Sequence, residues 1–195
     1  MFMRLFLILC LSLLSLVGCA SLSEEECQIT DWYKLGQGDA LEGYPQTRLK
    51  DHIKACQRYD ISPDIKRYGE GRKAGLQRYC TAENGFRVGR QGYRYQGICP
   101  AGTEKAFVGA YDRGSNLHKI ELDLAAARQE RNGLQKDLRQ DETYKNLTKA
   151  ETSARKLNLS RQIRQLGQEI DKLERKRDRE IFRSEQYLLR VAPET

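Results

Sequence analysis

Apolar residues in the C-terminal half of the chain recur with a helical period. Between residues 117 and 138 they stand three or four positions apart, with a polar break at Arg131, which is the spacing of one face of an amphipathic helix. From Leu159 to Leu173 the steps alternate between four and three, which is the heptad period of a coiled coil. A charged stretch at residues 175–180 then interrupts the apolar positions. Two helices with narrow apolar faces are therefore expected.

A break separates the two helical patterns. Residues 141–147 lack an apolar period, and Thr148 followed by Glu151 matches a capping box, a signal that starts a helix. We therefore expect a long antiparallel helical hairpin or coiled coil over residues 117–190, with a second helix over 149–184. The alternative is a single continuous helical rod, in which residues 141–147 are also helical. A narrow seam of this kind can also recruit a second copy of the chain.

The preceding region, residues 27–116, holds most of the glycine and aromatic residues. It contains a weak repeat in which a tyrosine is followed three positions later by a glycine. The pairs are Tyr33 and Gly36, Tyr68 and Gly71, and Tyr111 and Gly114. Positions three apart share one face of a helix, so we expect short helices whose glycines let a neighbouring backbone approach closely. The alternative is that these glycines form turns.

Residues 84–97 have a different pattern, in which apolar and basic residues alternate between glycines. This favours a Gly-rich loop or a short irregular hairpin. The expected fold is thus mainly α: a small, disulfide-stapled helical head with this loop or hairpin, followed by the long helical hairpin. The change in composition places the boundary near Gly114, and we expect residues 191–195 to be a disordered C-terminus.

The N-terminus has the organisation of a signal peptide. A basic start precedes an apolar run from Leu5 to Val17, which is too short for a membrane-spanning helix and suits a signal-peptide core. The residues Leu16-Val17-Gly18-Cys19 resemble the bacterial lipobox. The resemblance implies that residues 1–18 are removed and that Cys19 carries a diacylglyceryl thioether and an acylated amine, with palmitate-type chains. An ordinary secretory signal with an incidental Cys19, or a buried helix, is the alternative.

Lipidation of Cys19 would determine where the protein lies. Several acyl chains hold a protein firmly to a membrane, and Ala20 in place of aspartate implies the outer membrane of a Gram-negative cell envelope. We expect residues 19–26 to form a lipidated tether that reaches at most about 28 Å. The expected orientation is toward the periplasm, and the cell surface is the open alternative.

Four further cysteines lie beyond the signal peptide and the lipidated residue: Cys27, Cys56, Cys80 and Cys99. An even number in an oxidising compartment predicts two disulfides. Four cysteines allow three connectivities. We favour Cys27 with Cys56 and Cys80 with Cys99, because each pair brackets a segment whose pattern suggests that it doubles back on itself.

Composition restricts the classes of function. The chain has 195 residues, of which 39% are hydrophobic, and a net charge of +7 from 34 basic and 27 acidic residues. A chain this polar cannot bury a large core along its whole length, and it is not expected to span a membrane. Basic residues in the second long helix alternate with acidic ones, which favours a solvated face with local ion pairs. A nucleic-acid partner is therefore not expected.

Candidate chemistry is sparse. His52 stands four residues before Cys56, a spacing that can hold a metal, but a disulfide explains Cys56 better and no third ligand is apparent. We therefore expect no metal and no cofactor. A Ser-His-Asp arrangement is open, although no nucleophile-turn motif is present. The cluster of Asp31, Trp32, Tyr33 and Asp39 could form a carboxylate pair in a glycan-binding cleft, whereas helix capping by Asp31 is the simpler interpretation.

Several motifs follow one another in the head. They include Cys27…Asp31-Trp32-Tyr33-x-x-Gly36-x-x-Asp39, His52-x-x-x-Cys56, Tyr68-x-x-Gly71-x-x-x-Gly75-Leu76-x-x-Tyr79-Cys80 and Gly89-x-x-Gly92-x-x-Tyr95-x-Gly97-x-Cys99-Pro100. Together they resemble an uncharacterised bacterial lipoprotein family, domain of unknown function 2799, although Ala40 stands where a glycine would be expected. The resemblance implies an envelope lipoprotein and brings no activity or catalytic residues.

These observations lead to two functional hypotheses. The first is a non-enzymatic, lipid-anchored cell-envelope protein with a structural or protein-interaction role. Its partners would be the membrane, through the lipid, and a protein or a second copy of the chain, through the helical tail. The second hypothesis is a module that binds or hydrolyses peptidoglycan or another envelope glycan through the acidic and aromatic cluster of the head.

Overall fold

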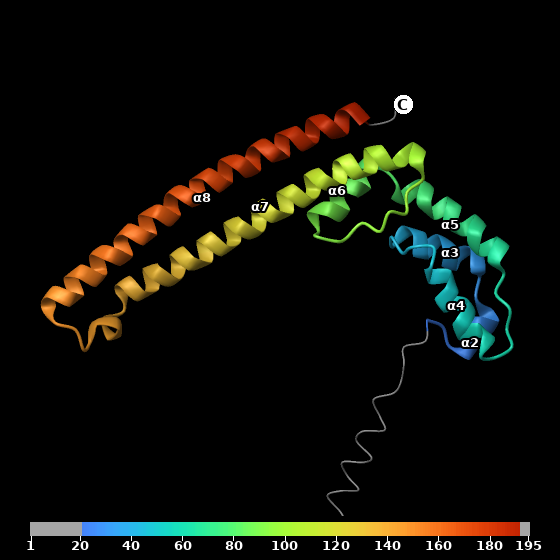
Figure 1. Cartoon of the computed structure of the whole chain (residues 1–195), viewed down its shortest axis with the longest axis horizontal. Coiled ribbons are helices and arrows are strands. Elements are labelled where there is room, and N and C mark those ends of the chain that lie inside the picture. The colour runs from blue at the N-terminus through green and yellow to red at the C-terminus, as the bar shows by residue number, and fades with distance from the viewer. Residues whose placement is uncertain (1–20, 192–195) are drawn as a thin grey trace, which may run out of the picture. The chain divides into compact units, whose positions relative to one another are not determined.

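A computed structural model describes residues 21–191. Within that range the chain consists of helices and connecting segments without a β-strand (Figure 1), which confirms the mainly α fold. The predicted signal peptide, Cys19 and residues 192–195 lie outside the described residues. The chain divides into two compact units, the first ending at Leu76 and the second beginning at Gln77. None of the described helices combines the length and apolar character needed to cross a bilayer.

The first unit contains helices α2 (Glu24–Ile29), α3 (Trp32–Leu41), α4 (Arg48–Gln57) and most of α5 (Ile65–Tyr79). Local capping residues start two of them. The Ser23 hydroxyl and the Glu26 carboxylate form a reciprocal capping box on α2, and Asp31 accepts hydrogen bonds from the first turn of α3. Both arrangements satisfy N–H groups that have no partner within a helix.

Residues 21–26 belong to this folded unit and are not an extended tether. The capping box begins helix α2 at Glu24. Leu22 is buried in an apolar cluster with Cys27, Ala55 and Cys56. The predicted tether is corrected for this stretch, because burial of Leu22 and satisfaction of the first helical turn favour a folded segment over an extended one.

The second unit contains the end of α5, then α6 (Ala82–Arg90), α7 (Ala101–Arg139), the short 3-10 helix η1 (Asp141–Tyr144) and α8 (Lys149–Val191). Helices α7 and α8 lie side by side as an antiparallel hairpin (Figure 1). Tyr187, near the end of α8, donates a hydrogen bond to the carbonyl of Ala106, near the start of α7. The structure thus has the predicted hairpin and not a single rod.

The turn of the hairpin follows the predicted signals. Thr148 and Glu151 form the capping box, since the Glu151 N–H donates to the Thr148 hydroxyl and the Glu151 carboxylate accepts from the Thr148 N–H at 2.8 Å. Helix α8 continues past the predicted end at residue 184, to Val191. Helix α7 begins at Ala101 and passes through Gly114 without interruption, so the compositional change near Gly114 is not the end of a helix.

The seam of the hairpin combines apolar and charged contacts. Leu124, Ala127 and Ile170 are buried together, with Leu166 and Leu173 packed against them. Farther along the seam, the Arg113 guanidinium lies over the Tyr187 ring, 4.6 Å from its centroid. Arg113 also pairs with Glu180 at 4.0 Å, so the charged stretch at residues 175–180 contributes an ion pair to the seam without ending the helix.

Residues 84–97 are not a hairpin or a continuous loop. Their first half is in helix α6, and only the residues after Arg90 are irregular. The expectation was wrong for residues 84–90, because Gly85 and Gly89 do not form turns, whereas residues 91–97 form an irregular segment as expected. They face α7, where a Cβ on Gly89 would lie 2.8 Å from the amide nitrogen of Ser115. Close helix packing therefore accounts for these glycines.

In each unit, glycines let two helix backbones pack in close contact. In the first unit Gly36 of α3 lies against the carbonyl of Tyr68, and Gly71 of α5 lies against the carbonyl of Tyr33. This confirms the close approach that the repeat predicts. The reciprocal arrangement recurs in the second unit, between α6 and α7, where Gly89 lies against Tyr111 and Gly114 against Phe86.

Both units also carry one disulfide, Cys27–Cys56 in the first and Cys80–Cys99 in the second. These are the favoured pairs. The spacings match as well. Both units contain a Cys-x5-aromatic-x2-Gly segment, beginning at Cys27 and Cys80, and a Cys-x11-Tyr-x2-Gly segment, beginning at Cys56 and Cys99. The two units thus share one pattern of cysteine, aromatic and glycine positions.

Candidate functional site

A buried polar network joins three helices of the first unit. The Tyr68 hydroxyl of α5 donates to Oδ2 of Asp39 on α3 at 2.6 Å, and Nε2 of His52 on α4 lies 2.9 Å from the same oxygen. Asp39, His52 and Tyr68 are only 7%, 2% and 1% exposed. Buried polar groups are costly unless they are hydrogen-bonded, so this mutual pairing makes the cluster compatible with the interior.

The network also reaches the N-terminal segment. Nδ1 of His52 lies 3.1 Å from the Ser21 hydroxyl. A carboxylate only accepts hydrogen bonds, so Nε2 of His52 donates to Asp39, and the Ser21 hydroxyl is the hydrogen-bond partner of Nδ1. The neighbouring Leu22 is buried beside the Cys27–Cys56 disulfide. One polar and one apolar contact therefore hold the first described residues onto the unit.

The surroundings determine the protonation of this network. Burial opposes ionisation of Asp39, but the hydrogen bonds from His52 and Tyr68, with the nearby charges of His52 and Arg48, hold its pKa below the usual value. Burial and the adjacent Asp39 carboxylate raise the pKa of Tyr68. Asp39 is therefore ionised and Tyr68 protonated at neutral pH.

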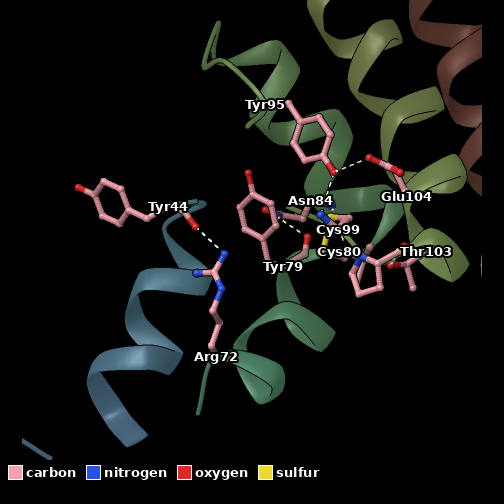
Figure 2. The surroundings of a disulfide bond; sticks show 11 residues. Tyr44, Arg72, Tyr79, Cys80, Asn84, Tyr95, Cys99, Thr103 and Glu104 are labelled. Carbon is pink, nitrogen blue, oxygen red and sulfur yellow. Dashed lines mark hydrogen bonds between the residues drawn. A yellow bond between two sulfur atoms is a disulfide. The ribbon is translucent and has the colours of Figure 1, made fainter. Parts of the chain in front are cut away.

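Two arginines add positive charge around the network. Nη2 of Arg72 donates to the carbonyl of Tyr44 at 2.8 Å, as Figure 2 shows, and Arg72 is 7% exposed. The Arg48 guanidinium lies over the Tyr44 ring, 5.0 Å from its centroid. The charge of Arg48 helps to lower the pKa of Asp39, and the charge of Arg72 acts on the neighbouring Tyr68.

The order of hydroxyl, imidazole and carboxylate resembles the relay of a serine hydrolase, in which the imidazole accepts the serine proton and the carboxylate orients the ring. In this protein the Tyr68 hydroxyl also donates a hydrogen bond to Oδ2 of Asp39, the same oxygen that pairs with His52. His52 is almost fully buried, so only Ser21 of this relay borders the surface. The network connects α3, α4, α5 and the N-terminal segment, and we assign it a positioning role.

The four residues predicted for glycan binding do not meet in one cleft. Asp31 caps α3 by accepting from the amides of Tyr33 and Lys34, which is the simpler interpretation. Asp39 lies about 12 Å farther along the helix axis and is buried. Trp32 packs against the Cys27–Cys56 cluster, while the Tyr33 ring lies under the Arg67 guanidinium.

The aromatic residues of the predicted loop point in different directions. Tyr95 packs on Phe107 and Tyr111, and its hydroxyl accepts from the Cys99 N–H at 2.9 Å and donates to Glu104 (Figure 2). Tyr93 is 64% exposed. One tyrosine therefore stabilises the region around the Cys80–Cys99 disulfide, and the other faces solvent.

The roles of Ser21, His52 and Tyr68 were missed from the sequence. We weighed His52 by name as a metal ligand beside Cys56, left a Ser-His-Asp arrangement open without naming its residues, and weighed Tyr68 only as part of the glycine repeat. A usable signal was present, because His52 shares a helix face with Ala55 and Cys56. A histidine on an apolar face needs a buried hydrogen-bond partner, and Asp39 is the acid available in the neighbouring helix.

Comparison with known proteins agrees with the motifs of the head. Residues 31–116 match the family model described as "Protein of unknown function (DUF2799)". No curated protein and no solved structure matches the chain. The matched segment begins at the cap of α3, includes both glycine-lined helix pairs and ends within α7. The chain therefore contains a domain of unknown function 2799, over residues 31–116.

Proposed function

We propose that this protein is a non-enzymatic, lipid-anchored protein of the Gram-negative cell envelope, attached to the outer membrane and facing the periplasm. Its helical hairpin serves as a structural or interaction arm. The observation that carries this proposal is the size and exposure of the hairpin, which consists of helices of 39 and 43 residues. Two helices share one seam, so most of their surface faces solvent and is available to partners.

The two disulfides support an envelope location, because such bonds persist in oxidising compartments. The docked N-terminal segment supports attachment at close range. Ser21 is hydrogen-bonded to His52 and Leu22 is buried, so the folded unit begins at Ser21. Only Cys19 and Ala20 would then lie between the lipid and this unit. Two residues span at most about 7 Å, and the first unit would therefore lie directly against the membrane.

Fatty-acid labelling and cell fractionation test the anchor. The full chain is expressed in a Gram-negative host that is fed an alkyne fatty acid, and labelling is compared with that of Cys19→Ser and Cys10→Ser. We expect the label and the outer-membrane location to be lost in Cys19→Ser and kept in Cys10→Ser, whose cysteine lies in the predicted signal peptide. An unlabelled wild-type protein, or labelling that survives Cys19→Ser, contradicts the proposal.

Self-association of the arm is tested separately. Sedimentation equilibrium of residues 20–195, which contain every described residue, distinguishes a monomer from a dimer. If the exposed surface of the arm recruits a second copy, a dimer forms and is weakened by Leu157→Glu, a change at an apolar side chain of α8 that is 51% exposed. A monomeric chain across the concentration range leaves another partner as the target of the arm.

A further inference from the structure

Charges on α8 separate onto two sides of the helix once the seam is known. The residues that face α7 include Leu159, Ile170 and Ser184, which are buried, and they follow the heptad spacing. On the outer side, seven exposed cations lie along one strip of the helix, with six of them between Lys172 and Arg190 and Arg161 apart from the rest. They are Arg161, Lys172, Arg175, Lys176, Arg179, Arg183 and Arg190. We call this strip the cationic face.

The acidic residues of α8 lie mainly on the opposite flank, and several are already paired. Glu174 binds Arg128 of α7 at 2.6 Å, and Asp178 binds Arg177 at 2.8 Å. None of the seven cations makes an ion pair within 4.0 Å with another described residue. Glu169 is an acid within the strip, since it stands one heptad before Lys176. Local pairing therefore neutralises one flank and leaves the cationic face unbalanced.

Two apolar side chains lie along one edge of the cationic face, toward its C-terminal end. Phe182 and Leu189 are 62% and 72% exposed. They stand one heptad apart, on the side of α8 that points away from the seam. Between Arg161 and Arg190 the face extends about 44 Å. Positive charge flanking exposed apolar residues is the chemistry of a helix that lies in a membrane interface.

We propose that the cationic face binds an anionic lipid surface. Lipid phosphates would pair with the seven cations, and the headgroup boundary would accept Phe182 and Leu189. Basic clusters of this size bind anionic membranes, with about 1 kcal/mol from each cation near the surface. A nucleic acid would satisfy the charges but offers no comparable layer for two apolar side chains. The inference deepens the proposed role of the arm and does not depend on lipidation of Cys19.

Vesicle co-sedimentation tests the proposal. Residues 20–195, with both disulfides formed, are mixed with vesicles of phosphatidylglycerol and phosphatidylcholine in equal parts, or of phosphatidylcholine alone. We expect binding to the anionic vesicles only, with strong weakening as salt rises from about 0.05 to 0.5 M. Reversal of four charges, Lys172, Arg175, Arg179 and Arg183 to Glu, is expected to weaken binding at least about 100-fold.

A matched variant controls for net charge. Reversal of Lys50, Lys54, Lys66 and Lys73, four exposed cations of the first unit, changes the net charge equally and is expected to change binding less than about 3-fold. Circular dichroism checks that both variants keep their helix content. Equal loss in the two variants, or equal binding to both kinds of vesicle, overturns the proposal.

A second pair of variants examines the apolar part of the cationic face. Phe182→Ser with Leu189→Ser is expected to weaken vesicle binding about 10-fold. Ile29→Ser with Leu122→Ser, which are exposed apolar residues elsewhere, should leave it unchanged. Binding to a DNA duplex that survives the Phe182 and Leu189 changes, together with absent vesicle binding, identifies a polyanion as the partner and overturns the lipid assignment. Because these chains lack Cys19, failure here leaves the labelling result for the anchor untouched.

Discussion

Gly71 lies directly against the backbone of Tyr33, and a Cβ at residue 71 would be 2.7 Å from the Tyr33 carbonyl carbon. Gly36 meets Tyr68 in the same way from the other helix. The two helices approach so closely at this point that neither side has room for a methyl group. The tyrosines therefore contribute through their backbones as well as through their rings.

Gly71→Ala should destabilise the first unit, because the new methyl group meets backbone that cannot rotate away. We expect a loss of about 1–3 kcal/mol in the free energy of unfolding, measured by urea denaturation. Gly69→Ala is the matched control in the same helix, since a Cβ there meets nothing within 4 Å. The control should stabilise by up to about 1 kcal/mol, and equal effects at the two positions would refute the close contact.

The free energy of unfolding should fall at acidic pH, because Asp39 becomes protonated. Its folded pKa is lowered, so ionisation stabilises the native state above the unfolded pKa of about 3.9. That contribution is lost as the pH falls through the folded pKa. Asp39→Asn should lower stability at pH 7 and flatten the acid limb of the stability profile. Urea midpoints between about pH 2 and pH 7 measure this, and an unchanged acid limb would disprove the assignment.

The Ser21 and His52 contact should anchor the N-terminal segment. Ser21→Ala is expected to cost about 1 kcal/mol and to accelerate hydrogen exchange in helix α2. His52→Ala should cost more, because it leaves the Asp39 carboxylate with one partner fewer. In a double-mutant cycle the effect of Ser21→Ala should vanish when His52 is absent. Additive losses would show that the two side chains do not interact, and Ser160→Ala on exposed α8 controls for the loss of a serine hydroxyl.

Each disulfide should stabilise its own unit. Replacement of Cys27 and Cys56 by serine is expected to cost about 3 kcal/mol and to expose the first unit to proteolysis, while the hairpin keeps its protection. Replacement of Cys80 and Cys99 should weaken the second unit instead. Thiol titration of the unreduced chain from residue 20 checks the pairing directly, and reactive thiols before reduction would contradict it.

The hairpin could be predicted because its signals are local. Heptad spacing and the Thr148 capping box depend on residues near one another in the chain, and α8 begins where the capping box indicates. Helix α6 was missed because glycine has a low helix propensity in isolation. Its contacts with Phe107 and Tyr111 come from a helix that follows in sequence, so only tertiary packing explains why Gly85 and Gly89 are helical.

The buried network and the cationic face were missed for the same kind of reason. His52 meets Asp39 only after three helices have folded, and one sequence does not specify that meeting. The mixed charges of α8 separate into two flanks only when the seam that faces α7 is known. Before that, Lys172 and Asp171 are simply neighbours of opposite charge. The disulfide pairs were easier to predict, because each closes a segment within one unit.

The continuity of α7 has a mechanical consequence. The same helix carries Gly114, which is fitted against α6, and Leu124, which is packed in the hairpin seam. Its 39 residues contain no break, so a force applied at the hairpin turn is transmitted along the axis without a hinge to absorb it. Within the second unit, α7 therefore acts as a stiff lever about 58 Å long, with its fulcrum at the glycine-lined crossing.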